Sequence, residues 1–264
     1  MILTIIQARL GSTRFPGKVF KEIIGKPMIF HMLDRVKRSN LVDELCVATS
    51  TNLKDDILAK KIEEYGIKVF RGSENDVLER FYNCANSFEE IPKIIIRLTS
   101  DCPLIDPGLI DDLISTFQND MDYPDYISNS LNPTLPDGLD CEVFTYDALE
   151  KAFFNAKNDF EREHVTPYIY LNKSEFNVKN KTYSDNKSFM RWTVDFPEDF
   201  EFVTKVYEQL YPKFGTNFTY RDVYSLLDQN PNLLNINSKF IRNEKFIEQL
   251  NTFFQKNSTN EKKL

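Results

Sequence analysis

Short apolar runs alternate with amphipathic stretches over the first hundred residues of the chain. Four of these runs are continuous and bounded by polar residues, which is typical of buried strands: residues 3–6, 44–49, 68–71 and 93–98. Between them apolar residues recur at helical spacing, and we expect helices over 27–38, 56–65 and 76–87. Apolar strands that alternate with helices are typical of a parallel sheet covered on both faces. The pattern therefore predicts an α/β fold that binds ligands at the carboxyl ends of its strands.

The alternation weakens after Tyr123, where a polar, proline-containing stretch begins. We expect strands over 141–145, 176–180 and 190–193, and helices over 146–155, 196–211, 220–227 and 242–255. No linker divides the chain, so we predict a single domain over residues 1–255. Within it, residues 129–189 form an inserted acceptor-binding or dimerisation region, and residues 256–264 form a flexible tail.

Composition and charge exclude several classes of protein. A chain of 264 residues with 41% hydrophobic residues can bury a large core. Its net charge of −7 disfavours a surface for nucleic acid or for an anionic membrane. No apolar run approaches the ~18 residues of a membrane span, and Met1 leads straight into a strand, so we expect a cytoplasmic protein. The four cysteines are widely spaced, which argues against zinc and for reduced, buried thiols.

The first strand runs into a loop that gathers three cations and a hydroxyl: Arg9, Ser12, Arg14 and Lys18. Glycines in the loop allow its backbone N–H groups to surround an anion, and arginine with lysine suits a polyphosphate. The loop is not a Walker loop, because five residues separate Gly11 from Gly17-Lys18 and Val19 stands where that motif has a hydroxyl. No G-x-G-x-x-G follows the strand either. A solvated basic loop is the simpler alternative.

Residues 7–18, Gln-Ala-Arg-Leu-Gly-Ser-Thr-Arg-Phe-Pro-Gly-Lys, resemble the N-terminal signature of the CTP-dependent sugar nucleotidyltransferases. These are the cytidylyltransferases that make CMP-activated acidic sugars, and the SpsF-like branch is the most similar. The resemblance implies a Rossmann-like, three-layer, GT-A-like fold. It also implies that Arg9, Ser12, Arg14 and Lys18 hold the CTP triphosphate. Thr49, Arg71 and Ser73 follow at neighbouring strand ends, where we expect further nucleotide contacts.

Two aspartates stand at positions that matter to this family. Asp101 follows the strand over 93–98, and Asp195 follows the expected strand over 190–193. The resemblance makes both of them Mg²⁺ ligands, since Mg²⁺ binds few carboxylates together with substrate phosphates. Each could instead be structural: Asp101 could cap a turn, and Asp195 could be the N-cap of the helix that follows it.

Two further segments resemble those of the SpsF-like branch. One contains Asp137, Asp140 and Glu142, and the other contains Arg162 and His164. The resemblance implies contacts with an acidic or amino sugar, or packing in a homodimer, and for His164 the two readings remain open.

The implied reaction is transfer of CMP from CTP to a sugar acid, with release of pyrophosphate. Arg9 and Lys18 would stabilise the phosphates, and Asp101 and Asp195 would hold the metal. CTP preference is less secure, because Ser50-Thr51 stands where related enzymes tend to carry an acidic pair. Two alternatives remain: a GT-A-type glycosyltransferase, although Asp101-Cys-Pro lacks the second acid of a D-x-D motif, and a non-enzymatic nucleotide-binding protein.

Overall fold

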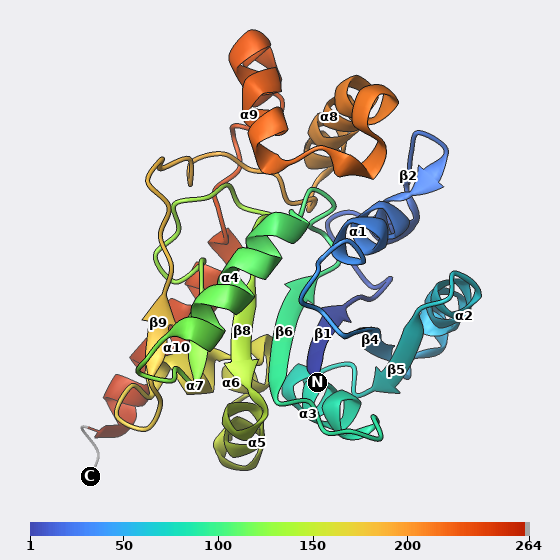
Figure 1. Ribbon diagram of the computed structural model, residues 1–264. Coiled ribbons are helices and arrows are strands. Elements are labelled where there is room, and N and C mark those ends of the chain that lie inside the picture. The colour runs from blue at the N-terminus through green and yellow to red at the C-terminus, as the bar shows by residue number, and fades with distance from the viewer. Residues whose placement is uncertain (262–264) are drawn as a thin grey trace.

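A computed structural model of the protein describes the backbone of residues 1–261 and side chains as far as Lys256. Its centre is a seven-stranded sheet (Figure 1). In spatial order the strands are β5 (Lys68–Gly72), β4 (Glu44–Ser50), β1 (Ile2–Gln7), β6 (Ile94–Thr99), β8 (Glu142–Thr145), β7 (Tyr126–Ser128) and β9 (Val178–Asn180). The first four strands are parallel, β8 is antiparallel to both its neighbours, and β7 and β9 are parallel to each other. The predicted α/β fold with a mostly parallel sheet is therefore confirmed.

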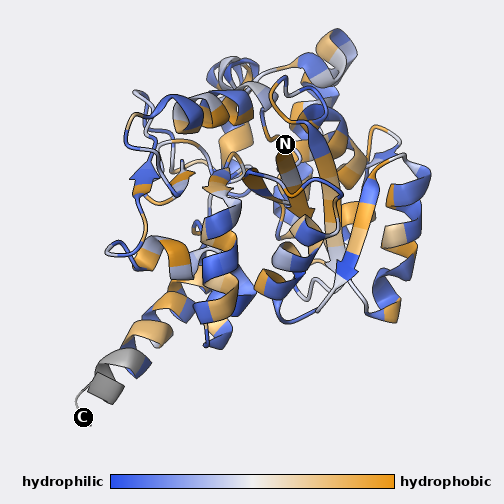
Figure 2. Ribbon diagram, turned by 60° about the horizontal axis from the view of Figure 1, so that its bottom comes forward, coloured by the Kyte–Doolittle hydropathy of each residue, from blue (hydrophilic) through white to orange (hydrophobic). Residues whose placement is uncertain are grey.

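Helices cover both faces of the sheet, because every strand of its parallel half is apolar on both sides. On one face pack α1 (Met28–Val36), α2 (Asp56–Glu64) and α4 (Pro107–Asn119). On the other face pack α3 (Val77–Asn86), α5 (Tyr146–Asn155) and α7 (Pro167–Leu171). Figure 2 shows hydrophobic residues concentrated in the central strands, which lie between these layers. The result is a three-layer core.

A third apolar cluster joins the C-terminal half to the edge of this core. It is built around α8 (Pro197–Phe214) and α9 (Tyr220–Gln229), with the buried Trp192 at its centre. The remaining helices are α6 (Asp159–His164) and α10 (Glu244–Glu261), and a small hairpin is formed by β2 (Glu22–Ile23) and β3 (Lys26–Pro27). Four 3-10 turns complete the described chain: Lys18–Phe20, Leu53–Asp55, Gly215–Asn217 and Pro231–Asn235. No helix in residues 1–261 is long and apolar enough to cross a membrane.

Local signals in the sequence account for several element ends. Asp76 caps α3 as predicted, since its carboxylate accepts a hydrogen bond from the backbone N–H of Glu79 at 2.9 Å. Helix α5 has the predicted bounds, Tyr146–Asn155. Helix α10 continues beyond its predicted end at Gln255 and through Glu261, so part of the predicted tail is helical, and residues 262–264 of that tail lie outside the described residues.

The predicted strand over 190–193 is wrong. Only one bridging pair forms there, between Asp137 and Arg191. Gly138 lies against the same segment with a φ of +107°, and a Cβ placed on it would be 2.5 Å from the backbone nitrogen of Thr193. The chain turns at once after that pair, because the N–H of Leu139 bonds back to the carbonyl of Pro136. Asp195 therefore follows an irregular segment rather than a strand.

Candidate active site

The loop after β1 carries Lys18 into the interior. The backbone N–H of Leu10 donates to Asp55 at 2.7 Å, which fixes the start of the loop against the neighbouring strand end. Gly17 then adopts a φ of +67°, a left-handed conformation that glycine accepts without steric cost. The turn that follows places Lys18 so that only 8% of it is exposed.

The ammonium of Lys18 joins the two predicted metal ligands. It donates to Asp101 at 3.0 Å, to Asp195 at 2.9 Å and to the carbonyl of Val194 at 2.7 Å. Burial would lower the pKa of Lys18, but the two carboxylates raise it. Burial would likewise raise the pKa of Asp101, yet the charge of Lys18 prevails and lowers it to about 2. Lys18 and Asp101 are therefore both charged at neutral pH.

Asp101 and Asp195 lie close together because hydrogen bonds join the two segments that carry them. The N–H of Val194 donates to the carbonyl of Asp101 at 2.8 Å, and the hydroxyl of Thr193 reaches the same carbonyl at 3.3 Å. Asp195 does not cap α8. That task falls to Asp199, whose carboxylate accepts from the backbone N–H groups of Asp195 and Phe196 at 2.9 and 3.0 Å. The carboxylate of Asp195 remains available to bind cations.

Arg191 organises the acids around this centre, and the sequence analysis assigned it no role. Its guanidinium donates to Asp199 at 2.9 Å, to Asp137 at 3.1 Å and to Asp195 at 3.3 Å. It stands in the segment Arg191-Trp-Thr-Val-Asp195, four residues before the aspartate it supports. Asp137 lies far away in the sequence, Asp195 lies in an irregular segment and Asp199 lies in the first turn of α8, so no single periodic pattern groups the three partners.

The predicted acceptor-binding acids are buried and paired with arginines. Asp137 bonds Arg191, Asp140 bonds Arg242, and Glu142 bonds Arg97 at 2.8 Å and the hydroxyl of Thr166 at 2.9 Å. Burial, reinforced by the negative charge of Asp140, raises the pKa of Asp137 to about 7. These acids lie near Asp101, and their arginine partners hold them in position.

Of the four predicted phosphate-binding residues, Lys18 and Arg14 contact this centre. Arg14 forms an ion pair with Asp195 at 2.8 Å, lies over the ring of Phe196 and keeps 39% of its side chain exposed. Arg9 is exposed and has no hydrogen bond or ion pair among the side chains that are described. The hydroxyl of Ser12 accepts from the backbone N–H of Phe15 at 3.3 Å.

Other predicted nucleotide contacts have structural partners instead. Thr49 is fully buried, so its hydroxyl does not reach the site surface. Arg71 bonds Asp56 and two backbone carbonyls, and the hydroxyl of Ser73 accepts from the N–H of Asp76 at 3.1 Å. None of the three contacts the Lys18 centre.

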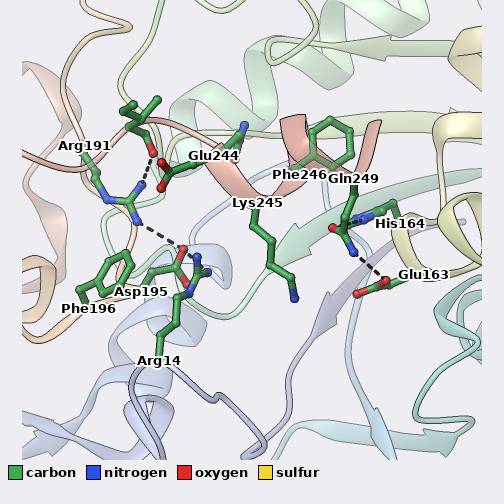
Figure 3. Close-up of a pocket in the computed structure, with 12 residues that line it drawn as sticks. Arg14, Glu163, His164, Arg191, Asp195, Phe196, Glu244, Lys245, Phe246 and Gln249 are labelled. Atoms are coloured by element: carbon green, nitrogen blue, oxygen red, sulfur yellow. Dashed lines mark hydrogen bonds and ion pairs between the residues drawn. The ribbon is translucent and has the colours of Figure 1, made fainter. Parts of the chain in front are cut away.

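The structure separates Arg162 from His164. Arg162 bonds Asp76 at 2.5 Å and the carbonyls of Phe153 and Ala156 at 3.0 Å, so its hydrogen bonds join α6 to α3 and α5 rather than facing the site. His164 lines a solvent-open pocket with a cavity volume of about 170 Å³, together with Arg14 and Asp195 (Figure 3). Of the two residues, His164 is therefore the one that an acceptor could reach.

The far side of this pocket is made by the start of α10 and the segment before it. The residues there are Ile241, Asn243, Glu244, Lys245, Phe246 and Gln249. The sequence analysis expected only a helix that covers the sheet or joins a partner. An amphipathic pattern shows which face of a helix is apolar, but it does not show which surface receives that face.

The two carboxylates suit a divalent cation. Asp101 and Asp195 already converge on one positive charge, the ammonium of Lys18. No group of three or more metal-binding side chains occurs in the part of the chain that the structure describes. Two carboxylates are nevertheless a fitting protein contribution for Mg²⁺, which takes its other oxygens from phosphates and water.

Comparisons with known proteins agree with this geometry. A family model described as cytidylyltransferase matches residues 3–256. The spore coat polysaccharide biosynthesis protein SpsF of Bacillus subtilis is 34% identical over 238 residues, 87% of this chain and 95% of that protein. The 3-deoxy-manno-octulosonate cytidylyltransferase of Anaeromyxobacter sp. strain K is 34% identical over 118 residues, 44% of this chain and 47% of that protein.

A solved structure extends the agreement to three dimensions. The structure of a cytidylyltransferase from Leptospira borgpetersenii superposes with a TM-score of 0.84 at 31% identity, over 91% of this chain and 98% of that one. The family match over residues 3–256 spans the first loop, both aspartates and the sheet that brings them together. The chain belongs to the cytidylyltransferase family, whose members are CTP-dependent nucleotidyltransferases.

Proposed function

We propose that this protein transfers CMP from CTP to a sugar acid and releases pyrophosphate, in the biosynthesis of a surface polysaccharide. The observation that carries the proposal is the convergence of Arg14 and Lys18, from the first loop, on Asp101 and Asp195. The names of the two curated relatives support the acceptor class, since one concerns a coat polysaccharide and the other a keto-sugar acid.

The loop residues would bind the triphosphate. Arg14 lies at the mouth of the site and Arg9 is exposed on the same loop, and guanidinium groups match phosphate oxygens in pairs. Lys18 lies deeper and holds both aspartates in one orientation. The chemical obstacle in nucleotidyl transfer is that a negatively charged phosphate repels its nucleophile, and positive groups fixed beside it reduce that repulsion.

We also propose that Asp101 and Asp195 hold a Mg²⁺ ion together with the nucleotide phosphates. When bound, the ion would offset negative charge on the phosphate that is attacked. Other residues of the chain position Asp195 for this role. Arg191 orients its carboxylate, and Asp199 keeps the backbone of Asp195 and Phe196 in place.

A nucleotide panel tests the proposal. The protein is incubated with Mg²⁺, each of the four nucleoside triphosphates in turn, and a set of 2-keto sugar acids that includes 3-deoxy-manno-octulosonate. We expect pyrophosphate release with CTP that depends on the acid. A glycosyltransferase would instead release a nucleoside diphosphate from a nucleotide sugar, and a protein that only binds nucleotide would release neither.

Arg14→Ala tests the loop separately from the chemistry. Loss of a charged hydrogen bond to phosphate should weaken CTP binding about tenfold or more, measured by calorimetry. Arg221→Ala is the matched control, because Arg221 is exposed on α9 and its side chain contacts only Tyr220, donating to the hydroxyl and lying over the ring. Equal CTP affinity in the two variants would show that the loop is a solvated basic loop that does not bind CTP.

A further inference from the structure

The segment between α9 and α10 is fastened to the acids of the active site. We call residues 237–249 the C-terminal arm. The amide of Asn237, which is 3% exposed, donates to the carbonyl of Arg191 at 2.8 Å and to Asp199 at 2.9 Å. Arg242 donates to the carbonyl of Leu135 at 2.9 Å and to the carboxylate of Asp140. The arm is therefore held by the residues that surround Asp195.

The other end of the arm is held across the pocket. Phe246 meets the ring of His164 edge-on, with centroids 4.9 Å apart. Gln249 bonds His164 at 3.0 Å and donates to Glu163 at 3.2 Å. Anchors at Arg242 and Phe246 thus lie on both sides of Lys245, so its backbone position is fixed.

Lys245 presents an unpaired positive charge to this pocket. Figure 3 shows its side chain extending from the start of α10 into the space between Asp195 on one side and Glu163 with His164 on the other. Among the side chains described, no carboxylate lies within ion-pair distance of its ammonium. The two other cations that line the pocket, Arg14 and Arg191, are both bonded to Asp195.

An acidic acceptor needs such a charge. The aspartates of the centre are already paired with Lys18 and with arginines, so a triphosphate would bring negative charge that these pairs do not offset. A carboxylate would be repelled unless a cation received it on the acceptor side. The pocket has a cavity volume of about 170 Å³ and is open to solvent, so an acceptor can enter it from outside.

We propose that Lys245 binds the anionic group of the acceptor and selects acidic acceptors over neutral ones. This inference rests on the proposed function and adds a residue and a basis for specificity to it. Lys245 acts through charge, whereas the rest of the C-terminal arm holds that charge in position.

Two substitutions and two acceptors form the test. Lys245→Met removes the charge and keeps most of the side chain, and Lys245→Arg keeps the charge. The acceptors are 3-deoxy-manno-octulosonate, or whichever sugar acid of the panel supports pyrophosphate release, and the carboxamide of the same sugar. KM and kcat are measured at saturating CTP. Lys256→Met is the control, because Lys256 is an exposed lysine farther along α10.

We expect Lys245→Met to raise the KM for the acid by roughly 10- to 150-fold, the range for one charge-assisted hydrogen bond. Its KM for the carboxamide should match that of the wild type, so the preference for the acid disappears. Lys245→Arg should retain the preference, Lys256→Met should have no effect, and CTP affinity without acceptor should be unchanged in all three.

The outcomes separate the two claims. An unchanged KM in Lys245→Met, or an equal rise for acid and carboxamide, overturns the inference and leaves the proposed function in place. A wild-type protein that releases no pyrophosphate from CTP with any acid of the panel overturns the proposed function, and the inference with it.

Discussion

Replacing Lys18 by Met should destabilise the protein and open its two aspartates to divalent ions. Lys18 is buried and is the one residue that contacts both Asp101 and Asp195 among the described ion pairs. Met has a similar length and cannot donate a hydrogen bond. The variant therefore leaves two adjacent carboxylates and the carbonyl of Val194 without this partner.

The pKa of Asp101 gives the magnitude. A fall from 3.8 to about 2 corresponds to roughly 2.5 kcal/mol of stability at neutral pH, at about 1.36 kcal/mol per pKa unit. Removing one partner of a fully buried pair can cost about 3 to 5 kcal/mol, but the side chains of Asp101 and Asp195 are 26% and 20% exposed. We therefore expect a loss of about 2 to 3 kcal/mol.

The sign of the pH dependence follows from the lowered pKa. A carboxyl with a lowered pKa in the folded chain stabilises it fully above its unfolded pKa of about 4, and that contribution is lost as the pH falls through about 2. The stability difference between wild type and Lys18→Met should thus be constant from pH 7 to 5 and should shrink between pH 4 and 2.

Urea unfolding with and without MgCl₂ is the assay. A metal that binds only the folded chain adds about 1.4 kcal/mol when present at ten times its Kd. Added Mg²⁺ should restore stability to Lys18→Met more than to the wild type, because the ammonium no longer occupies the space between the two carboxylates. Lys26→Met is the control, since Lys26 pairs with Asp34 away from the site. The side chains of Lys26 and Asp34 are 25% and 26% exposed. A Lys18→Met protein as stable as wild type, or an equal response to Mg²⁺ in all three proteins, would refute the reasoning.

Three further predictions follow from the same structure. Asp195→Asn should lose less stability than Lys18→Met, because Asp199 supplies the cap of α8 and Lys18 keeps its bonds to Asp101 and Val194, while pyrophosphate release at limiting Mg²⁺ falls at least tenfold; near-native turnover would remove Asp195 from the ligand set. Arg162→Met should lower stability by about 1 to 3 kcal/mol, because its hydrogen bonds join three helices, and should leave the acceptor KM unchanged; a raised KM with normal stability would place Arg162 in the acceptor site after all. We also predict a homodimer formed through residues 129–189, and light scattering that gives a mass of 31.0 kDa would contradict it.

The sequence predicts the parallel half of the fold well, because its strands are continuous apolar runs with few alternatives. β4, β5 and β6 lie within one residue of their predicted ends, and Asp76 caps α3 as its spacing indicates. The segment over 190–193 alternates apolar and polar residues but forms no strand, since Gly138 brings another backbone against it. Whether such a segment finds an extended partner depends on contacts far along the chain, which a local pattern does not contain.

Some residues of the candidate site could also be predicted from the sequence, and others could not. Lys18, Asp101 and Asp195 could be selected by residue type and position, but their ion pairs span 83 and 177 residues of sequence. Arg191 was missed although it lies in the segment that drew attention to Asp195. A buried arginine is recognised by the acids around it, and those acids come together only in the folded chain.

In the folded protein, much of the positive charge of the basic loop is balanced by the aspartates of the site. In the sequence, the loop is a local concentration of positive charge. In the structure, the charges of Arg14 and Lys18 are balanced by those of Asp101 and Asp195, so these four groups carry no net charge. A triphosphate that approaches them meets charge-neutral pairs, with the unpaired Arg9 as the remaining cation of the loop. Strong binding of a polyanion therefore requires an additional cation near the aspartates. A divalent ion bound by these carboxylates would supply that charge, so nucleotide affinity should depend on the ion.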